Sequence, residues 1–238
     1  MSKKNIFFIK HLFVSIFFAI LALLIVFIFW YPAPLASAVG VTDLFFMMLV
    51  IDVLIGPILG FIVYKEGKKT LKMDVIIIIV IQVSALLYGL YSIEKGRPVY
   101  VVYNIDRFEL VRKNEIISND DSQLSSIGIS PNYVAVKYPD DIKLRDQLMF
   151  DEIFGGVSLS QRPEYYQPLD SVQHKMKLKA QVLQNLSQFN STTDIEKILK
   201  EYPTAIGFVP LKSNHLDMTV LVDQNAQVVK VVDLRPWD

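Results

Sequence analysis

The residue types that carry most enzyme chemistry are sparse in this chain and do not fall at catalytic spacings. There is no cysteine, which excludes a disulfide framework, a thiol nucleophile and a cysteine-ligated zinc ion. His174 and His215 lie far apart and match neither an HxxH nor an HExxH spacing. The sequence also has no GxSxG elbow and no phosphate-cradling glycine loop. We therefore expect a protein that is not an enzyme, with no catalytic, cofactor-binding or metal-binding residues.

One ionisable residue stands out because of its surroundings. Asp52 is the only charged residue in the apolar run 44–64. A charge at the centre of a bilayer costs a few kcal/mol or more, so this side chain should face protein or water rather than lipid. Two interpretations stay open: a hydrogen bond to a neighbouring helix, at Gln82 or Ser84, or a site for a partner or a proton-coupled step.

Two glycines follow Asp52 at a spacing that suits close helix packing. The string Gly56-Pro57-Ile58-Leu59-Gly60 is a small-xxx-small pattern, which lets another helix approach the backbone. Pro57 removes one backbone donor and is expected to kink the helix. We interpret Asp52, Gly56, Pro57 and Gly60 as candidate partner contacts, on a helix face that is either internal or intermolecular.

Three long apolar runs must position these residues, at 12–30, 44–64 and 75–93. About 20 residues at 1.5 Å per residue give roughly 30 Å, the hydrocarbon thickness of a bilayer. None of the runs has the polar face of an amphipathic helix, which argues against helices in the core of a soluble protein. The mean hydropathy of the whole chain is +0.36. The sequence predicts a membrane protein whose residues 1–95 form three transmembrane α-helices.

Lysines distinguish the two ends of these helices. Lys3, Lys4 and Lys10 precede the first run, and the loop 65–74 carries four more lysines, whereas the loop 31–43 carries no lysine or arginine. Because short cytoplasmic loops are rich in such cations, we expect the N-terminus in the cytoplasm and the C-terminal part outside.

A cleavable signal peptide is the alternative interpretation of the first run. Ala36-Ser37-Ala38 resembles a cleavage site, and it follows a basic start. The apolar run is longer than the 7–15 residues usual for a signal, which favours a retained helix. The expected orientation is the same in both cases.

The rest of the chain has the composition of a soluble domain. Of 48 charged residues, 37 follow Ile93, and the formal charge is +3 up to that residue and −3 beyond it. This division excludes a single soluble globule and a disordered chain. It also excludes a protein built around a basic face for nucleic acid.

Residue patterns in 96–238 predict an α+β domain with an antiparallel sheet, which the expected orientation of the helices makes extracytoplasmic. Strands are expected at 99–103, 133–138, 207–211, 218–222 and 227–232, with a hairpin turn at 223–226. Helices are expected at 140–154, 170–189 and 193–202, and a polar loop or short helix at 114–131.

Several short strings occur in an order that resembles the TfpX/TfpZ family of type IV pilin accessory proteins. They are WYPAPL (30–35), GV (40–41), IDV (51–53), GP (56–57), YK (64–65), Gln82, LYGLY (87–91), GRP (96–98) and DRFELV (106–111). A weaker similarity extends to the last strands and the string Leu234-Arg235-Pro236-Trp237. Within this pattern Asp106 and Arg107 form a candidate structural family motif.

The resemblance implies a bacterial inner-membrane protein that supports the stability or assembly of a major pilin, as an accessory factor or chaperone. The expected partners are the major type IV pilin, inner-membrane lipid and the pilus assembly platform, with no cofactor and no nucleic acid. On this hypothesis the helix 44–64 packs against the pilin helix through Gly56 and Gly60. Asp52 would meet a polar group of the pilin stem, and the outer domain would touch the pilin head.

Two other functional classes remain open at the level of sequence. The first is a membrane-tethered sensor or scaffold whose outer domain binds a ligand. The second is a small transporter or intramembrane enzyme that uses Asp52. Three helices with a single ionisable group offer few convergent polar residues for such a pathway.

Overall fold

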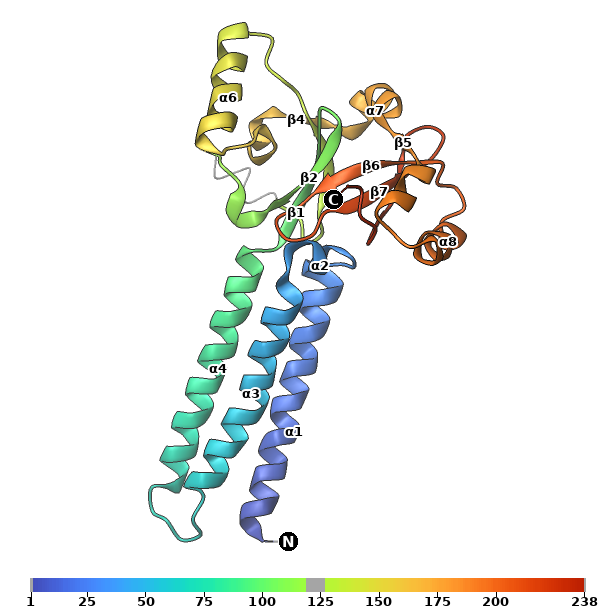
Figure 1. Ribbon diagram of the computed structural model, residues 1–238. Helices are drawn as coiled ribbons and strands as arrows, with labels where there is room; N and C mark the ends of the chain where they lie inside the picture. The colour runs from blue at the N-terminus through green and yellow to red at the C-terminus, as the bar shows by residue number, and fades with distance from the viewer. Residues whose placement is uncertain (1, 119–126, 238) are drawn as a thin grey trace. The chain divides into compact units, whose positions relative to one another are not determined.

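The computed structural model describes residues 2–118 and 127–237, and the chain divides into two compact units (Figure 1). The first unit comprises Met1–Trp30 and Val41–Gly96, and the second comprises Tyr31–Gly40 and Arg97–Asp238. The second unit therefore includes the segment that joins the first two long helices. Part of the polar segment expected at 114–131 lies outside the described residues.

The first unit consists of three long apolar helices, as the sequence predicts. They are α1 (Lys3–Leu24), continued by the π-helical η1 (Ile25–Trp30), α3 (Val41–Val63) and α4 (Leu71–Lys95). Each is long and apolar enough to cross a membrane. α3 packs against both α1 and α4 (Figure 1). The helices extend beyond the apolar runs because flanking polar residues continue the helical turns; at the start of α1, the Ser2 hydroxyl accepts a hydrogen bond from the Asn5 amide.

Most large apolar side chains of this unit point outward. In α4, all of whose residues are described, none is buried. Val80 and Ile81 are 57% and 63% exposed, and Phe13 of α1 is 68% exposed. Apolar surface of this extent is stable only when lipid or protein covers it.

The second unit is built on an eight-stranded sheet with the strand order β4-β3-β1-β2-β6-β7-β8, and β5 pairs with β6 off this path. The strands are β1 (Pro98–Asn104), β2 (Arg107–Arg112), β3 (Asn132–Val136), β4 (Tyr166–Pro168), β5 (Gln181–Val182), β6 (Gly207–Lys212), β7 (Met218–Val222) and β8 (Val228–Val232). The helices are α2 (Leu35–Val39), α6 (Ile142–Gly155), α7 (Gln173–Lys179) and α8 (Thr192–Glu201). Short 3₁₀ turns are η2 (Lys113–Glu115), η3 (Leu159–Gln161), η4 (Pro163–Tyr165), η5 (Leu169–Val172) and η6 (Leu183–Gln188).

The predicted α+β class is confirmed, but the prediction of an antiparallel sheet is wrong, because the sheet is mixed. β1 runs parallel to β3, and β2 runs parallel to β6. A parallel pair needs a long crossover connection. The chain supplies one between β2 and β3 and another, with several helices, between β2 and β6.

The expected helix 170–189 is also wrong, because the segment is divided. It forms η5, α7 and η6, and the break between α7 and η6 is the short strand β5. Gln181 and Val182 leave the helix to pair with Phe208 and Gly207 of β6. Apolar spacing along the segment could not reveal this tertiary pairing, which competes with helix propensity.

The segment between α1 and α3 is a structural part of the second unit, named the outer domain here after the location expected from the sequence. Leu35 and Ala38 of α2 are 4% and 0% exposed, and both belong to the largest apolar cluster of the domain. The Ala38 carbonyl accepts hydrogen bonds from the amides of His215 and Leu216, each at 3.1 Å, and from the Ser213 hydroxyl at 2.8 Å. The cleavage-like string Ala36-Ser37-Ala38 therefore lies within a folded and hydrogen-bonded segment.

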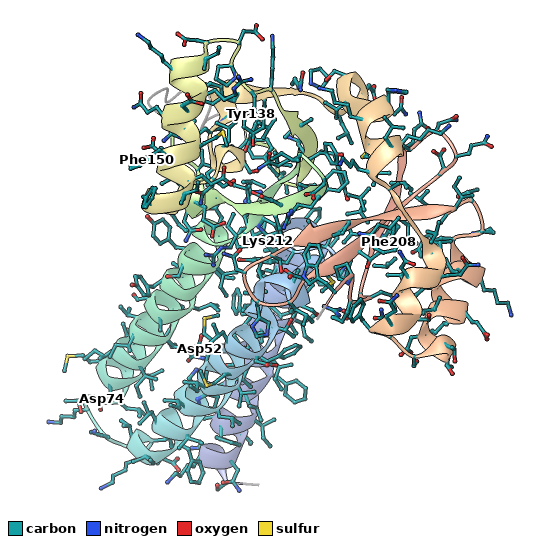
Figure 2. All side chains as sticks on the ribbon, turned by 45° about the horizontal axis from the view of Figure 1, so that its top comes forward. Asp52, Asp74, Tyr138, Phe150, Phe208 and Lys212 are labelled. Carbon is teal, nitrogen blue, oxygen red and sulfur yellow. The ribbon has the colours of Figure 1, made fainter. Side chains whose placement is uncertain are left out.

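The remaining core lies under the other helices of the unit. Met176 of α7 packs in the same cluster as Leu35, while Leu148 of α6 closes a second cluster against β1. A third cluster joins Ile195 of α8 to Phe208 of β6, and Phe208 is labelled in Figure 2. Each face of the sheet is thus covered by segments that are distant in sequence.

Replacement of Leu35 tests whether the interhelical segment stabilises the outer domain. Leu35→Ala removes a buried side chain, so we expect a loss of about 2–5 kcal/mol in the free energy of unfolding. Leu178→Ala is the matched control, because Leu178 is 72% exposed on α7. Thermal unfolding of the full chain in detergent measures the stability of each variant. The rate of proteolysis of the outer domain is a second measurement. Equal stability of the two variants would contradict the structural role of this segment.

Candidate functional site

A polar cluster at the centre of the first unit links all three of its long helices. The Gln82 Nε2 of α4 donates to the Ser15 hydroxyl of α1 at 3.0 Å and to the main-chain oxygen of Asp52 in α3 at 2.8 Å. The Gln82 Oε1 lies 3.1 Å from the His11 Nε2, also in α1. A single amide side chain therefore holds three helices through both of its polar atoms, in apolar surroundings where such bonds are difficult to replace.

Asp52 lies at the middle of α3 (Figure 2). Gln82 is one of the two neighbours considered for it, but the hydrogen bond reaches the main-chain oxygen and not the carboxyl group. Among the described residues, the buried Asp52 Oδ2 and His11 Nδ1 have no hydrogen-bond partner. A buried polar atom without a partner costs about 1–3 kcal/mol. In this cluster both polar atoms of Gln82 thus have partners, whereas the Asp52 Oδ2 and the His11 Nδ1 can each form a further hydrogen bond.

The two glycines of the small-xxx-small pattern pack against neighbouring helices of the same unit. A Cβ atom on Gly56 would lie 2.0 Å from the Gln82 Oε1. A Cβ atom on Gly60 would lie 3.0 Å from the Phe7 Cε1 and 3.1 Å from the His11 Nδ1. A larger residue at 56 would have to displace the Gln82 side chain, which is held by its hydrogen bonds to α1 and α3.

The glycine face is therefore internal. Gly56, Pro57 and Gly60 are all buried, and α3 continues as one helix through Pro57. The sequence left open whether this face is internal or intermolecular. In the structure it packs inside the helix unit. In this structure the neighbours of Gly56 and Gly60 are side chains of α4 and α1, and the packing of a pilin helix against these glycines stays a prediction.

Two cavities adjoin the polar cluster. The larger, of about 260 Å³, is lined by residues of α1, α3 and α4 and includes His11, Ser15, Asp52 and Gln82. The smaller, of about 180 Å³, is lined by α3 and α4 alone. Apart from the polar cluster, the walls of both cavities are apolar. The larger cavity is therefore an apolar recess with polar groups on one wall.

Sequence reasoning missed His11 and Ser15. Both belong to α1, at positions separated by four residues, so they share one face of the helix. Polar residues four apart at the edge of an apolar run were the available signal. Only the tertiary arrangement shows that this pair faces Gln82.

The Asp106–Arg107 motif lies at the turn between β1 and β2. The Arg107 Nε donates to the Asp106 Oδ1 at 2.9 Å, and the guanidinium carbon lies 5.7 Å from the centre of the Trp237 ring. The Trp237 indole nitrogen in turn donates to the Asp217 Oδ2 at 2.6 Å. These contacts tie the turn to the end of the chain.

A second polar network lies in the outer domain. The Ser158 hydroxyl donates to the Glu109 Oε2 at 2.8 Å, and the Asn104 Nδ2 donates to its Oε1 at 3.4 Å. The Tyr138 hydroxyl (Figure 2) donates to the Asn104 Oδ1 at 3.0 Å. Burial, with the negative charge of Glu109, raises the pKa of the Glu152 carboxyl group above its ordinary value. Each oxygen of the Glu109 carboxyl group therefore accepts a hydrogen bond from a neighbouring side chain.

The helix α6 of the outer domain also presents apolar side chains to its surface. The apolar side chains of Phe150 (Figure 2), Ile153 and Phe154 on α6 are 60%, 72% and 73% exposed. Within the described ranges, no three His, Asp or Glu side chains gather closely enough to hold a metal ion.

A double-mutant cycle tests the packing of Gln82 into Gly56. Gly56→Ala alone should destabilise the helix unit by about 1–3 kcal/mol, because the added methyl group overpacks the contact. In a Gln82→Ala background the same change should cost much less, because the clashing side chain is gone. Unfolding of purified protein in mixed detergent micelles gives the four stabilities. If the stability changes of the two single variants add up to that of the double variant, the two positions do not interact.

The raised pKa of Glu152 predicts a pH-dependent variant. A carboxyl group whose pKa is higher in the folded state stabilises the fold below its unfolded pKa, and this contribution is lost as pH rises through the folded pKa. Glu152→Gln should therefore raise the melting temperature relative to the natural chain at about pH 8 and change it little at about pH 4. Glu196→Gln, at an exposed position on α8, gives the background effect of the substitution. A higher melting temperature of Glu152→Gln at acid pH only would contradict the raised pKa of Glu152.

Comparison with known proteins gives a consistent result. No family model matches the chain, and no solved structure matches it. The fimbrial assembly protein of serogroup I from Dichelobacter nodosus is 30% identical over 242 residues, which covers 96% of this chain and 94% of that protein. The protein of serogroup E1 from the same organism is 29% identical over 243 residues, with the same coverage. That of serogroups C1 and C2 is 37% identical over 112 residues, or 46% of this chain and 86% of that protein. Since similarity at this level extends over nearly the whole length of both proteins, the chain belongs to the family of fimbrial assembly proteins.

Proposed function

We propose that the protein is a non-catalytic accessory factor of type IV pilus assembly, of the TfpX/TfpZ kind, which binds the major pilin before it enters the pilus. The names of the relatives support a role in pilus assembly. The many outward-facing apolar side chains on α1, α3 and α4 support the proposed binding of the major pilin. Such helices can contact another apolar helix laterally within a bilayer.

The proposed location is the bacterial inner membrane, with the N-terminus in the cytoplasm and the outer domain in the periplasm. An ion pair joins Lys3 to Glu66, and the Lys4 ammonium lies 4.0 Å from the centre of the Phe61 ring. The start of α1 and the end of α3 therefore lie together, at one cationic end of the helix unit. Cations at the same end support a cytoplasmic location for both segments.

In this proposal the pilin is held in two places. An unassembled pilin with an apolar helix and a globular head would lie in the membrane beside this protein. The three helices would bind the apolar stem, and the outer domain would contact the head. Inner-membrane lipid covers the remaining apolar surface, and the assembly platform would receive the pilin afterwards.

Co-purification tests this function directly. The full chain, tagged and extracted in mild detergent from cells that make pili, should recover the major pilin. Deletion of the gene should reduce both surface pili and the amount of pilin protein, because unprotected pilin is degraded. Restoration by the natural chain is the control for the deletion.

The same experiment separates the alternatives. A sensor would change the amount of pilin messenger RNA, whereas an accessory factor leaves it unchanged. Normal pilin levels together with no recovered pilin would contradict the proposal.

A further inference from the structure

A groove between α1 and α4 has the form of a site for one more helix. α3 forms its floor through Leu49, Asp52 and Val53, and the cavity of about 260 Å³ lies over this floor. The flanking residues Val14 of α1 and Val83 of α4 are 52% and 47% exposed. The groove is therefore open at the surface of the unit, in the direction where a fourth helix would complete a bundle.

The floor of this groove carries an unmet hydrogen-bonding requirement. Gln82 already uses its two polar atoms on His11, Ser15 and the main chain of Asp52. The Asp52 Oδ2 is buried and, among the described residues, has no partner. Because this oxygen is enclosed, an occupant's donor would reach it once the carboxyl group turned toward the cavity, and the new hydrogen bond would remove the cost of leaving it unsatisfied.

We propose that the groove between α1 and α4 receives the apolar membrane helix of the pilin, which donates a hydrogen bond from one polar side chain to Asp52. This inference rests on the proposed function and names its contact. The cavity beside Asp52, of about 260 Å³, is too small for a helix, so the helix backbone lies in the groove and its side chains enter the cavity. A lipid tail would fill the apolar walls and leave the carboxyl oxygen without a donor.

The proposed site differs from the glycine face that the sequence suggested. Gly56 and Gly60 serve the internal contacts of α3, while the groove is lined by the face that includes Leu49 and Val53. Asp52 is the one residue shared by the sequence hypothesis and the structural one.

Site-specific photo-crosslinking tests the groove in living cells. A photoreactive residue at Val83 should give an adduct with the major pilin. Ile77 is the matched control, because it lies on the same helix, is 49% exposed against 47% for Val83, and lines neither cavity at the polar cluster. A third position, Ile81, lines the smaller cavity between α3 and α4 and should also give no pilin adduct.

Substitution of Asp52 tests the hydrogen bond. Asp52→Leu should lower the yield of the Val83 adduct about threefold to tenfold, which corresponds to one interhelical hydrogen bond in a membrane. Asp52→Asn retains a carbonyl acceptor and should keep most of the yield. Equal yields in Asp52→Leu and the natural chain would overturn the role of Asp52.

A second variant does not disturb the polar cluster. Val83→Trp should fill the groove and abolish recovery of pilin with the tagged chain, whereas Ile77→Trp should leave recovery unchanged. Recovery that survives Val83→Trp would overturn the groove as the binding site.

The outcomes distinguish this inference from the proposed function. Pilin that co-purifies with the natural chain but cross-links at Ile77 or Ile81 instead of Val83 leaves the function standing and overturns the groove. A Val83 adduct only with a second copy of this chain, or only with phospholipid, also overturns it. Absence of pilin from the natural complex would contradict the function, and with it this inference.

Discussion

The first unit depends on the amide of Gln82. Apolar packing alone would give α4 little preference for α3, because lipid is as favourable an apolar environment as another helix. Hydrogen bonds to Ser15 and to the main chain of Asp52 give α4 a defined position. Gly56 permits this arrangement by leaving room for the Gln82 side chain. The amide in the middle of α4 thus has an organising role, and beside it the Asp52 Oδ2 has no hydrogen-bond partner among the described residues.

How far sequence reasoning reaches differs between the two units. Helices in a bilayer must satisfy their own backbone, so length and apolarity alone predicted α1, α3 and α4. In the outer domain, residue alternation found β6, β7, β8 and the turn before β8, where Asp223 accepts hydrogen bonds from the Asn225 and Gln227 amides. It missed β2, because charged residues interrupt its apolar pattern. Parallel pairing, as between β1 and β3, depends on long crossovers and leaves no local signal.

The candidate site shows the same limit. Asp52 was recognisable because a charge in an apolar run is costly. The neighbour of the glycine face could not be recognised, because a GxxxG spacing indicates that a helix approaches closely and does not indicate which helix. His11 contributes to the site only because α1 places it beside Gln82. Of the relatives, two share similarity over nearly the full chain, so the membrane unit and the outer domain belong together in this family.

The short helix α2 has a consequence for how the protein is made. Residues Leu35 and Ala38 are synthesised early, but their core neighbours Val209, Met218 and Val220 are synthesised almost two hundred residues later. The outer domain therefore remains incomplete until the chain has crossed between the two units for the third time, after Gly96. A secreted fragment that began at Arg97 would lack part of its own core, so the boundary of the folding unit does not coincide with the end of the last membrane helix.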